Sequence, residues 1–570
     1  MNFSLPKRWN AFRISILMLL NFLLSLASHA QTGIAVPSMV NCDNLIANFM
    51  NKYEVPGAAF TLAKNGKIVY SRAFGKANLS GTELAQPYHL FRIASISKPI
   101  TSIAIMKLVE QGSLGLDDLV FGAKGVLQGH PEFSAVNISD PGICKITVNH
   151  LLEHAAGWNR EVKCFPYPTL PYSWKVSGCD PISAPLFVSQ QTGTGNPVSK
   201  SSLINFLLEK GLDFRPGTDY AYSNIGYLIL GKIIEVKTGL TYEQYVKDNV
   251  LSPIGICDMH LGKNLLADKR EREAEYHGNG SKTLSAYGTG KLVPWEYGGY
   301  NIEAMDAHGG WLATSSDLVK LLAAVDDLNS KPCILTAASI SKMVSPSANN
   351  PGYAKGWSVN RSNNWWHTGS LDGTASFFCR TNNGYTWAII LNKRITGSQA
   401  NNFWKDLDAL PWNCISSTSS FPSHDLMLAP TENCSNLKVS EMKNKAVTIN
   451  WNNGNGDTRI LLASNMGPIN SFPLDGVDYE ADASFGLGND LGNGTFVVYS
   501  GNGNAAEVDN LNPDLPCYFR VFEFNKNSAT GNYPLYKLCN SEMATVLPLA
   551  LAEKKHPMKK LTLIQIHQRE

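Results

Sequence analysis

The 570-residue sequence lacks several features, and each absence narrows its function. It contains no C-x-x-C and no H-E-x-x-H spacing, so nothing resembles a zinc site, and we expect neither a metal nor a cofactor. It has no G-x-S-x-G, which excludes an α/β-hydrolase. It has no large excess of one charge, since 49 Lys and Arg face 47 Asp and Glu. Without surplus cations to neutralise phosphates, nucleic acid is excluded as the main partner.

Long apolar runs are also absent beyond the first 30 residues. There, a basic start precedes an apolar run from Ile14 to Ala27, and Ser28-His29-Ala30 follows. The run is shorter than the roughly 20 residues that span a bilayer, so a membrane anchor is the weaker alternative. Residues 1–30 are predicted to be a signal peptide. The mature protein is then expected to be exported, to the periplasm, the cell surface or outside the cell, with no membrane span.

Cysteine is present in an odd number, 11, all after the predicted signal peptide. At least one is therefore unpaired or bonded between chains. Cys164 and Cys179 enclose about 15 residues within a segment rich in Pro, Ser, Thr and Gly, residues 160–200, and we predict that they are bonded to each other. The segment is either a lid or binding loop or a surface excursion held by that disulfide.

The composition, 44% hydrophobic and 17% charged, is that of a globular protein with more than one folded unit. Residues 38–412 alternate strand-like and helical patterns and are predicted to form an α+β unit. Residues 413–432 lose this periodicity and are predicted to be a linker with few crossing contacts. Residues 433–546 are short alternating segments, typical of an all-β sandwich. The lysine-rich end, 547–570, is either a disordered solvated tail or a degenerate sorting tail.

The first candidate catalytic residues follow the strand-like segment 91–93. A helix is predicted to begin at Ser95 and to end at Gly112, with Pro99 tolerated in its first turn. Ser95 and Lys98, three residues apart, then share one helix face. The lysine amine can take the serine proton if burial lowers its pKa.

S-x-x-K is a weak signal by itself, and Ser339-Ile340-Ser341-Lys342 repeats the same four letters. Only Ser95 has a strand-like segment before it and the expected partners after it. We therefore choose Ser95 as the nucleophile over the alternative of a helix-capping serine.

The expected partners are a Y-x-N and a [KH]-T-G element. Tyr222-Ser223-Asn224 is the one Y-x-N in the chain; its phenol can relay a proton to the leaving group, and its amide can bind lysine and a substrate carbonyl. The alternative is a turn tyrosine with a capping Asn. Lys237-Thr238-Gly239 ends a helix, so we choose His367-Thr368-Gly369, a strand whose edge offers backbone donors, Ser370 N–H with Ser95 N–H, to an oxyanion.

With Leu151 to Trp158 and Gly309-Gly310-Trp311, these motifs resemble the serine β-lactamase-like family over about residues 40–410. The branch is that of class C β-lactamases, D-alanyl-D-alanine carboxypeptidases, family VIII esterases and D-amino-acid peptidases. The resemblance implies a β-lactamase/transpeptidase-like fold, an antiparallel sheet flanked by helices. His154, inside the first of these motifs, is interpreted as a packing residue.

The resemblance also implies a role for each site residue. Ser95 would form the acyl-enzyme, Lys98 would be its base and Tyr222 the acid/base partner. The residues that would contact substrate are Asn224, His367, Thr368, Gly369 and Ser370. His367 departs from the lysine of the lactamases; an imidazole is only partly charged near neutral pH, which weakens recognition of a substrate carboxylate.

The C-terminal segment resembles a fibronectin type III-like module. The resemblance rests on the strand ending at Trp451, the turn 453–456 and Leu511-Asn512-Pro513, and it departs at Cys517, where such modules place a corner tyrosine. It implies attachment to a cell wall or glycan surface.

The sequence thus predicts an exported serine hydrolase that acts on esters or D-amino-acid amides through an acyl-enzyme. The alternatives are a catalytically silent protein that binds peptidoglycan peptides and a true class C-type β-lactamase.

Overall fold

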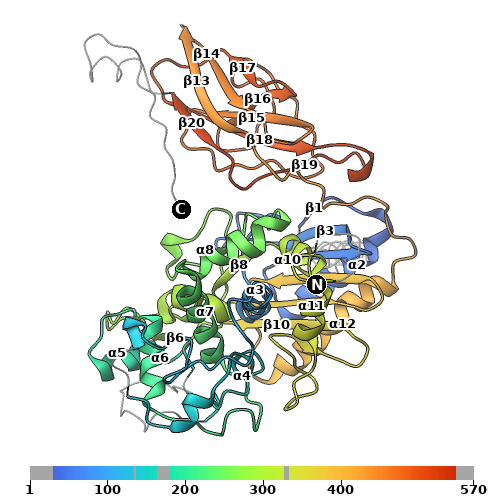
Figure 1. The fold of residues 1–570 in the computed structure, drawn as a ribbon. Helices are drawn as coiled ribbons and strands as arrows, with labels where there is room; N and C mark the ends of the chain where they lie inside the picture. The colour runs from blue at the N-terminus through green and yellow to red at the C-terminus, as the bar shows by residue number, and fades with distance from the viewer. Residues whose placement is uncertain (1–29, 134–136, 163–179, 327–332, 444, 547–570) are drawn as a thin grey trace, which may run out of the picture.

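The computed structural model describes residues 30–133, 137–162, 180–326, 333–443 and 445–546. It contains two units, and the C-terminal β unit lies against one end of the larger N-terminal unit (Figure 1). The predicted signal peptide, the Cys164–Cys179 pair and the basic tail lie outside the described residues. Within the described residues, no helix is long and apolar enough to span a bilayer.

The N-terminal unit is built on an antiparallel sheet with strand order β1-β3-β2-β12-β11-β10-β9. This confirms the predicted α+β fold, although the unit begins at residue 31 rather than 38, because β1 pairs with β3. The strands of this sheet are β1 (Gln31–Gly33), β2 (Gly57–Lys64), β3 (Lys67–Gly75), β9 (Ser358–Val359), β10 (Trp365–Leu371), β11 (Thr374–Arg380) and β12 (Tyr385–Leu391).

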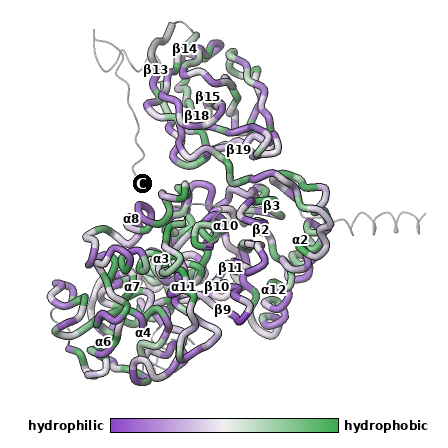
Figure 2. Tube along the Cα trace, turned by 45° about the vertical axis from the view of Figure 1, so that its right-hand side comes forward, coloured by the Kyte–Doolittle hydropathy of each residue, from purple (hydrophilic) through white to green (hydrophobic). Residues whose placement is uncertain are grey.

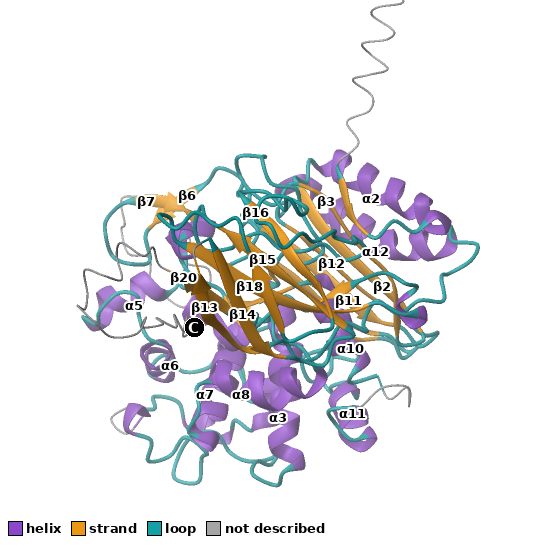
Figure 3. Ribbon diagram, turned by 90° about the horizontal axis from the view of Figure 1, so that it is seen from above, coloured by secondary structure: helices purple, strands orange, loops and turns teal. Residues whose placement is uncertain are grey.

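Helices cover both faces of this sheet. Figure 3 shows α2 and α12 on one side and α10, α3 and α7 on the other. The helices are α2 (Val40–Tyr53), α3 (Ser97–Glu110), α4 (Val148–Leu152), α5 (Pro185–Thr192), α6 (Lys200–Leu208), α7 (Asn224–Thr238), α8 (Tyr242–Val246), α9 (Ile302–Met305), α10 (Ser315–Ala323), α11 (Ala337–Val344) and α12 (Ala400–Ser416).

Helix α3 is the centre of the larger hydrophobic core. Its Ile100, Ile103 and Met106, with Ile96 just before it, are fully buried. Gly112 follows the helix with φ +69°, a left-handed conformation that glycine adopts without a Cβ penalty. Figure 2 shows hydrophobic segments inside both units. Packing of α3 against α7 and the segment Asp306–Gly310 therefore fixes the helix that carries Lys98 of the predicted motif.

The C-terminal unit consists of two antiparallel sheets that enclose a core containing Trp451, as the alternating pattern predicted. One sheet has the order β13-β14-β17; the other has the order β16-β15-β18-β19, with β20 also on β18. The strands are β13 (Ser435–Lys443), β14 (Ala446–Asn452), β15 (Thr458–Ser464), β16 (Thr495–Gly501), β17 (Ala505–Val508), β18 (Cys517–Asn525), β19 (Leu535–Tyr536) and β20 (Met543–Val546).

The predicted linker differs from the structure. Helix α12 continues to Ser416, and its Cys414 is bonded to Cys42. Beyond the helix, Leu426 N–H donates to the carbonyl of Ile68 at 2.9 Å, so the segment lies on the sheet of the first unit. The expectation of few crossing contacts is therefore wrong, because hydrogen bonds to strand β3 replaced the solvated chain that the composition suggested.

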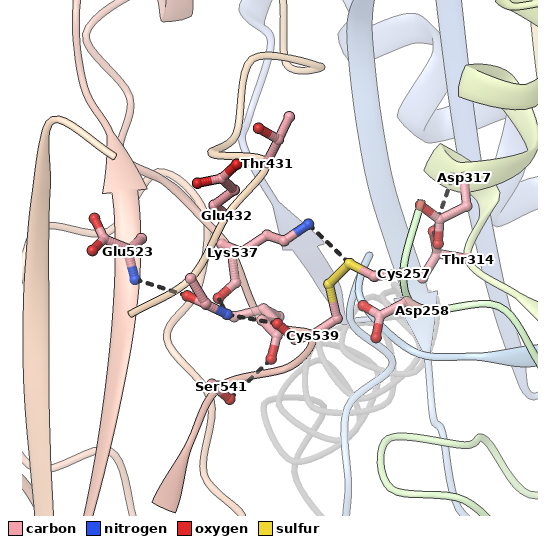
Figure 4. Close-up of a disulfide and its surroundings, with 12 residues drawn as sticks. Cys257, Asp258, Thr314, Asp317, Thr431, Glu432, Glu523, Lys537, Cys539 and Ser541 are labelled. Atoms are coloured by element: carbon pink, nitrogen blue, oxygen red, sulfur yellow. Dashed lines mark hydrogen bonds between the residues drawn. A yellow bond between two sulfur atoms is a disulfide. The ribbon is translucent and has the colours of Figure 1, made fainter. Parts of the chain in front are cut away.

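A disulfide between Cys257 and Cys539 joins the two units directly (Figure 4). Nearby, Arg520 of the sandwich forms an ion pair with Glu271 at 3.0 Å. A cavity of about 370 Å³ lies between the units, with Lys320 and Lys537 in its wall. The units are thus covalently and electrostatically connected across this junction.

Candidate active site

The chain approaches Ser95 through a short strand and a strained turn. Strand β4 (Phe91–Arg92) pairs with β8 (Trp311–Ala313), as the strand-like segment predicted. Ala94 then adopts φ +47°, which is uncommon for a residue with a Cβ. Such strain persists only where the surroundings impose it, and it is frequent at functional sites. It leaves Ser95 partly exposed between two buried neighbours, in a 3₁₀ turn (Ala94–Ile96). The α-helix α3 begins only at Ser97, after this turn, and not at Ser95 as predicted.

Ser95 and Lys98 are in contact, as their spacing predicted. Lys98 Nζ lies 3.0 Å from Ser95 Oγ and donates to the carbonyl of His308 at 2.8 Å. The lysine is fully buried, and this burial lowers its pKa well below the ordinary value. A neutral amine beside a serine hydroxyl can accept the hydroxyl proton.

Tyr222 stands next to this pair. Lys98 Nζ lies 4.8 Å from the centre of the Tyr222 ring, and the phenol also interacts with the Ser95 hydroxyl. Burial raises the pKa of Tyr222, so the phenol keeps its proton at neutral pH. It is therefore suited to donate a proton.

Asn224, the first residue of α7, has a partner that the sequence did not predict. Its Nδ2 lies 3.0 and 3.1 Å from the two carboxylate oxygens of Asp180. Among the described residues, it makes no hydrogen bond with Lys98, so that expectation is wrong. Its Oδ1 is buried without a hydrogen-bond partner within the described part of the chain. That oxygen remains available to a substrate N–H.

The predicted His367-Thr368-Gly369 element lies on β10, directly against the Ser95 turn. Strand β10 pairs with β11 along its length but with β9 only at Trp365 and Trp366, so its far half has an open edge. A Cβ on Gly369 would lie 2.1 Å from the carbonyl oxygen of Ile93. Glycine is required here because only a missing side chain lets the strand approach the backbone just before Ser95 so closely.

The side chain of His367 is buried from solvent. Burial is the main cause that lowers its pKa, to about 3. The imidazole is thus neutral at physiological pH, and not merely partly charged as the sequence suggested. The side chains that alternate with it, Thr368 and Ser370, are exposed.

The competing motif at Ser339 has a different environment. Ser339 lies in the first turn of α11, where its N–H donates to the side chain of Thr336 at 3.3 Å. Lys342 is exposed to solvent. This S-x-x-K is therefore part of a capped helix whose lysine faces solvent, unlike the buried Lys98.

Sequence reasoning missed Asp180 and Tyr353, which stand beside Asn224 and His367, respectively. Neither residue belongs to a recognisable motif, and the chain brings them in from distant segments. His154 is buried and hydrogen-bonded, as predicted, but its partner is also Tyr353, at 3.0 Å.

Comparison with known proteins identifies the family of this chain. The family profile described as Beta-lactamase matches residues 42–410, well over half of the chain. The chain belongs to the β-lactamase family. In this β-lactamase-family protein, the match ends within α12 and leaves the C-terminal sandwich outside it.

Two curated relatives are similar over part of the chain. Protein flp of Staphylococcus aureus (strain MW2) is 25% identical over 343 residues, 60% of each chain. Penicillin-binding protein 4* of Bacillus subtilis (strain 168) is 28% identical over 212 residues, 36% of this chain and 38% of that protein. The match thus spans about three fifths or less of these relatives' lengths.

Two solved structures also resemble the chain. The D-amino acid amidase of Ochrobactrum anthropi SV3, complexed with L-phenylalanine, is 21% identical, covers 66% of this chain and all of its own, and has a TM-score of 0.49. The octameric penicillin-binding protein homologue of Pyrococcus abyssi is 22% identical, covers 87% of this chain and 99% of its own, and has a TM-score of 0.47.

Proposed function

We propose that this protein is an exported serine hydrolase that acylates Ser95 with esters or D-amino-acid amides. The observation that carries the proposal is the contact between Ser95 Oγ and a fully buried Lys98 whose pKa is lowered. In this proposal, Lys98 Nζ takes the hydroxyl proton as Ser95 Oγ attacks the carbonyl carbon. The N–H groups of Ser95 and Ser370 receive the developing oxyanion.

Collapse of the tetrahedral intermediate breaks the bond to the leaving group. Tyr222 donates its phenol proton to the leaving group at this step, which its raised pKa supports. Lys98 then passes the proton that it took from Ser95 to the phenol. Water then attacks the acyl-enzyme, with the same groups acting in reverse. The Asn224 amide and the strand His367 to Ser370 hold the substrate between them.

The neutral His367 favours substrates that have no carboxylate next to the scissile bond. A β-lactam carries such a carboxylate and is better held by a permanent cation. Esters and D-amino-acid amides are therefore the preferred substrates over penicillins and cephalosporins. For the C-terminal sandwich we propose a fibronectin type III-like module that binds a cell-wall or glycan surface.

Labelling with a fluorophosphonate, followed by peptide mapping, tests the nucleophile. The adduct is expected on Ser95, absent from Ser95→Ala and retained in Ser339→Ala. Ser339 is a matched control because it begins the second S-x-x-K. An adduct on Ser339, or turnover without any adduct, contradicts the proposal.

A substrate panel tests the specificity. We expect kcat/KM at pH 7 to 8 to be higher for short-chain p-nitrophenyl esters or D-amino-acid amides than for cephalosporins, with Ser95→Ala as the blank. His367→Lys should raise the lactam rate. Cephalosporin hydrolysis faster than ester hydrolysis would identify a true β-lactamase, and binding of D-Ala-D-Ala peptides without turnover would identify a silent binding protein.

A further inference from the structure

Two buried imidazoles on different elements are joined through one tyrosine. His154 follows α4, His367 lies on β10, and Tyr353 comes from the segment between α11 and β9. Tyr353 Oη lies 3.0 Å from His154 Nε2 and 3.3 Å from His367 Nε2. All three side chains are at least 96% buried. The contact joins parts of the chain that are some 200 residues apart.

Backbone groups at the two ends give this chain of hydrogen bonds a direction. Ser223 N–H can only donate, and it donates to His154 Nδ1 at 3.2 Å, so the proton of neutral His154 lies on Nε2. The carbonyl of Thr368 can only accept, and it lies 2.6 Å from His367 Nδ1, so that nitrogen carries the proton. His154 therefore donates to Tyr353, and Tyr353 donates to His367.

One other acceptor competes for the Tyr353 proton. Tyr227 also interacts with Tyr353, but its own hydroxyl donates to the carbonyl of Leu152 at 2.8 Å. If Tyr353 donated to Tyr227, the bare Nε2 of His367 would be buried without a partner, at a cost of about 1–3 kcal/mol. Donation to His367 gives each of His154, Tyr353 and His367 a hydrogen-bond partner.

We propose that Tyr353 is a positioning residue that ties the Tyr222–Asn224 loop to the His367–Gly369 strand and, with His154, holds His367 as an uncharged hydrogen-bond acceptor. This proposal rests on the Ser95 hydrolase function proposed above. It adds an explanation for the uncharged His367 on the substrate-facing strand. The Tyr222 ring lies 4.3 Å from the His154 ring and 6.3 Å from the His367 ring, so the proposed proton donor lies close to both imidazoles.

Protonation of either imidazole would break this series of hydrogen bonds. A second proton on His154 would face Ser223 N–H, and one on His367 would face Tyr353 O–H. Burial lowers the pKa of both histidines in agreement with this geometry. The titratable and charged groups that face the two imidazoles are Lys98, Arg160, Tyr220, Tyr222, Tyr227 and Tyr353.

Nitrogen-15 NMR of the full chain, with labelled histidines, tests the direction without using activity. Between pH 5 and 9 we expect neutral His154 with its proton on Nε2 and neutral His367 with its proton on Nδ1, assigned through His154→Gln and His367→Gln. Tyr353→Phe should shift the His367 Nε2 resonance, and the neighbouring Tyr220→Phe should not. A charged His367, the opposite tautomer or no shift in Tyr353→Phe overturns the proposal, whether or not Ser95 is the nucleophile.

A double-mutant cycle tests the effect on catalysis. We expect Tyr353→Phe and His367→Gln each to lower kcat for a p-nitrophenyl ester about tenfold, with KM changed less than twofold. Together they should cost about tenfold rather than about a hundredfold, because both break one chain. Tyr220→Phe should combine multiplicatively with His367→Gln. Multiplicative effects for Tyr353→Phe and His367→Gln would show two independent contacts and overturn the positioning role.

Discussion

The pocket around Ser95 and the junction between the two units each contain a buried lysine. Burial lowers the pKa of Lys98 well below its ordinary value, and it lowers the pKa of Lys537 to about 8. Their surroundings differ. Lys98 contacts a serine hydroxyl and a carbonyl beside an open strand edge, whereas Lys537 Nζ lies 2.8 Å from Cys257 Sγ of the disulfide.

The comparison shows that a lowered lysine pKa reports burial and does not by itself identify an active site. At the junction, the neighbouring Lys320 contributes to the shift, and the disulfide offers no nucleophilic hydroxyl. In the pocket, the same physical effect lies next to the hydroxyl of Ser95, the proposed nucleophile. The partners of the lysine, and not its pKa, separate the two regions.

Replacing each lysine by methionine should separate the regions most strongly. Lys98→Met is expected to lower kcat/KM for a p-nitrophenyl ester by about 10³-fold, because general base catalysis contributes about 10²–10⁴-fold. Lys537→Met should stay within twofold of the wild type. A loss of similar size in both variants would mean that the junction acts on the chemistry.

Removing the junction disulfide should affect stability and leave catalysis intact. Cys257→Ser with Cys539→Ser opens a cross-link over 282 residues, and we expect the free energy of unfolding to fall by about 4 kcal/mol. Denaturant unfolding measures the change. Cys144→Ser is the control, because Cys144 is unpaired among the residues that the structure describes. An unchanged stability would show that the ion pair and packing hold the junction without the bond.

The pH dependence of stability should reveal Lys537. Its folded pKa of about 8 lies below the ordinary 10.5, so between these values the unfolded chain binds more protons. Stability then rises with pH over this range, by about 3 kcal/mol at 1.4 kcal/mol per pKa unit. The rise is measured as the difference between wild type and Lys537→Met from pH 7 to 10.5. If the unfolding free energies of the wild type and Lys537→Met changed in parallel with pH, the lowered pKa of Lys537 would be refuted.

The smallest effect is expected from the ion pair at the same junction. Glu271 is 49% exposed on its side chain and lies 3.0 Å from Arg520. Glu271→Gln should cost no more than about 1 kcal/mol, and high salt should reduce the difference. Thermal unfolding at low and high ionic strength checks this. A loss that salt does not change would indicate that packing carries the contact.

The site residues differ in how far they could be predicted. The contact between Ser95 and Lys98 could be predicted because a helix places residues three apart on one face. The order of motifs along the chain favoured Ser95 over Ser339, and the structure adds a physical difference: Lys98 is buried, whereas Lys342 is exposed. The Asn224 contact was wrong because its partner, Asp180, comes from a segment without a motif.

The sequence by itself determined what depends on neighbours along the chain. These features are the helix after Ser95, the strand at His367, the alternating β segments and the family motifs, because their periodicity and spacing are local. Only the tertiary structure decided what depends on long-range contacts: the neutrality of His367, the role of Tyr353 and the junction formed by Cys257 and Cys539. The physical reason is that burial, pKa and disulfide pairing are set by groups hundreds of residues away, which no local pattern encodes.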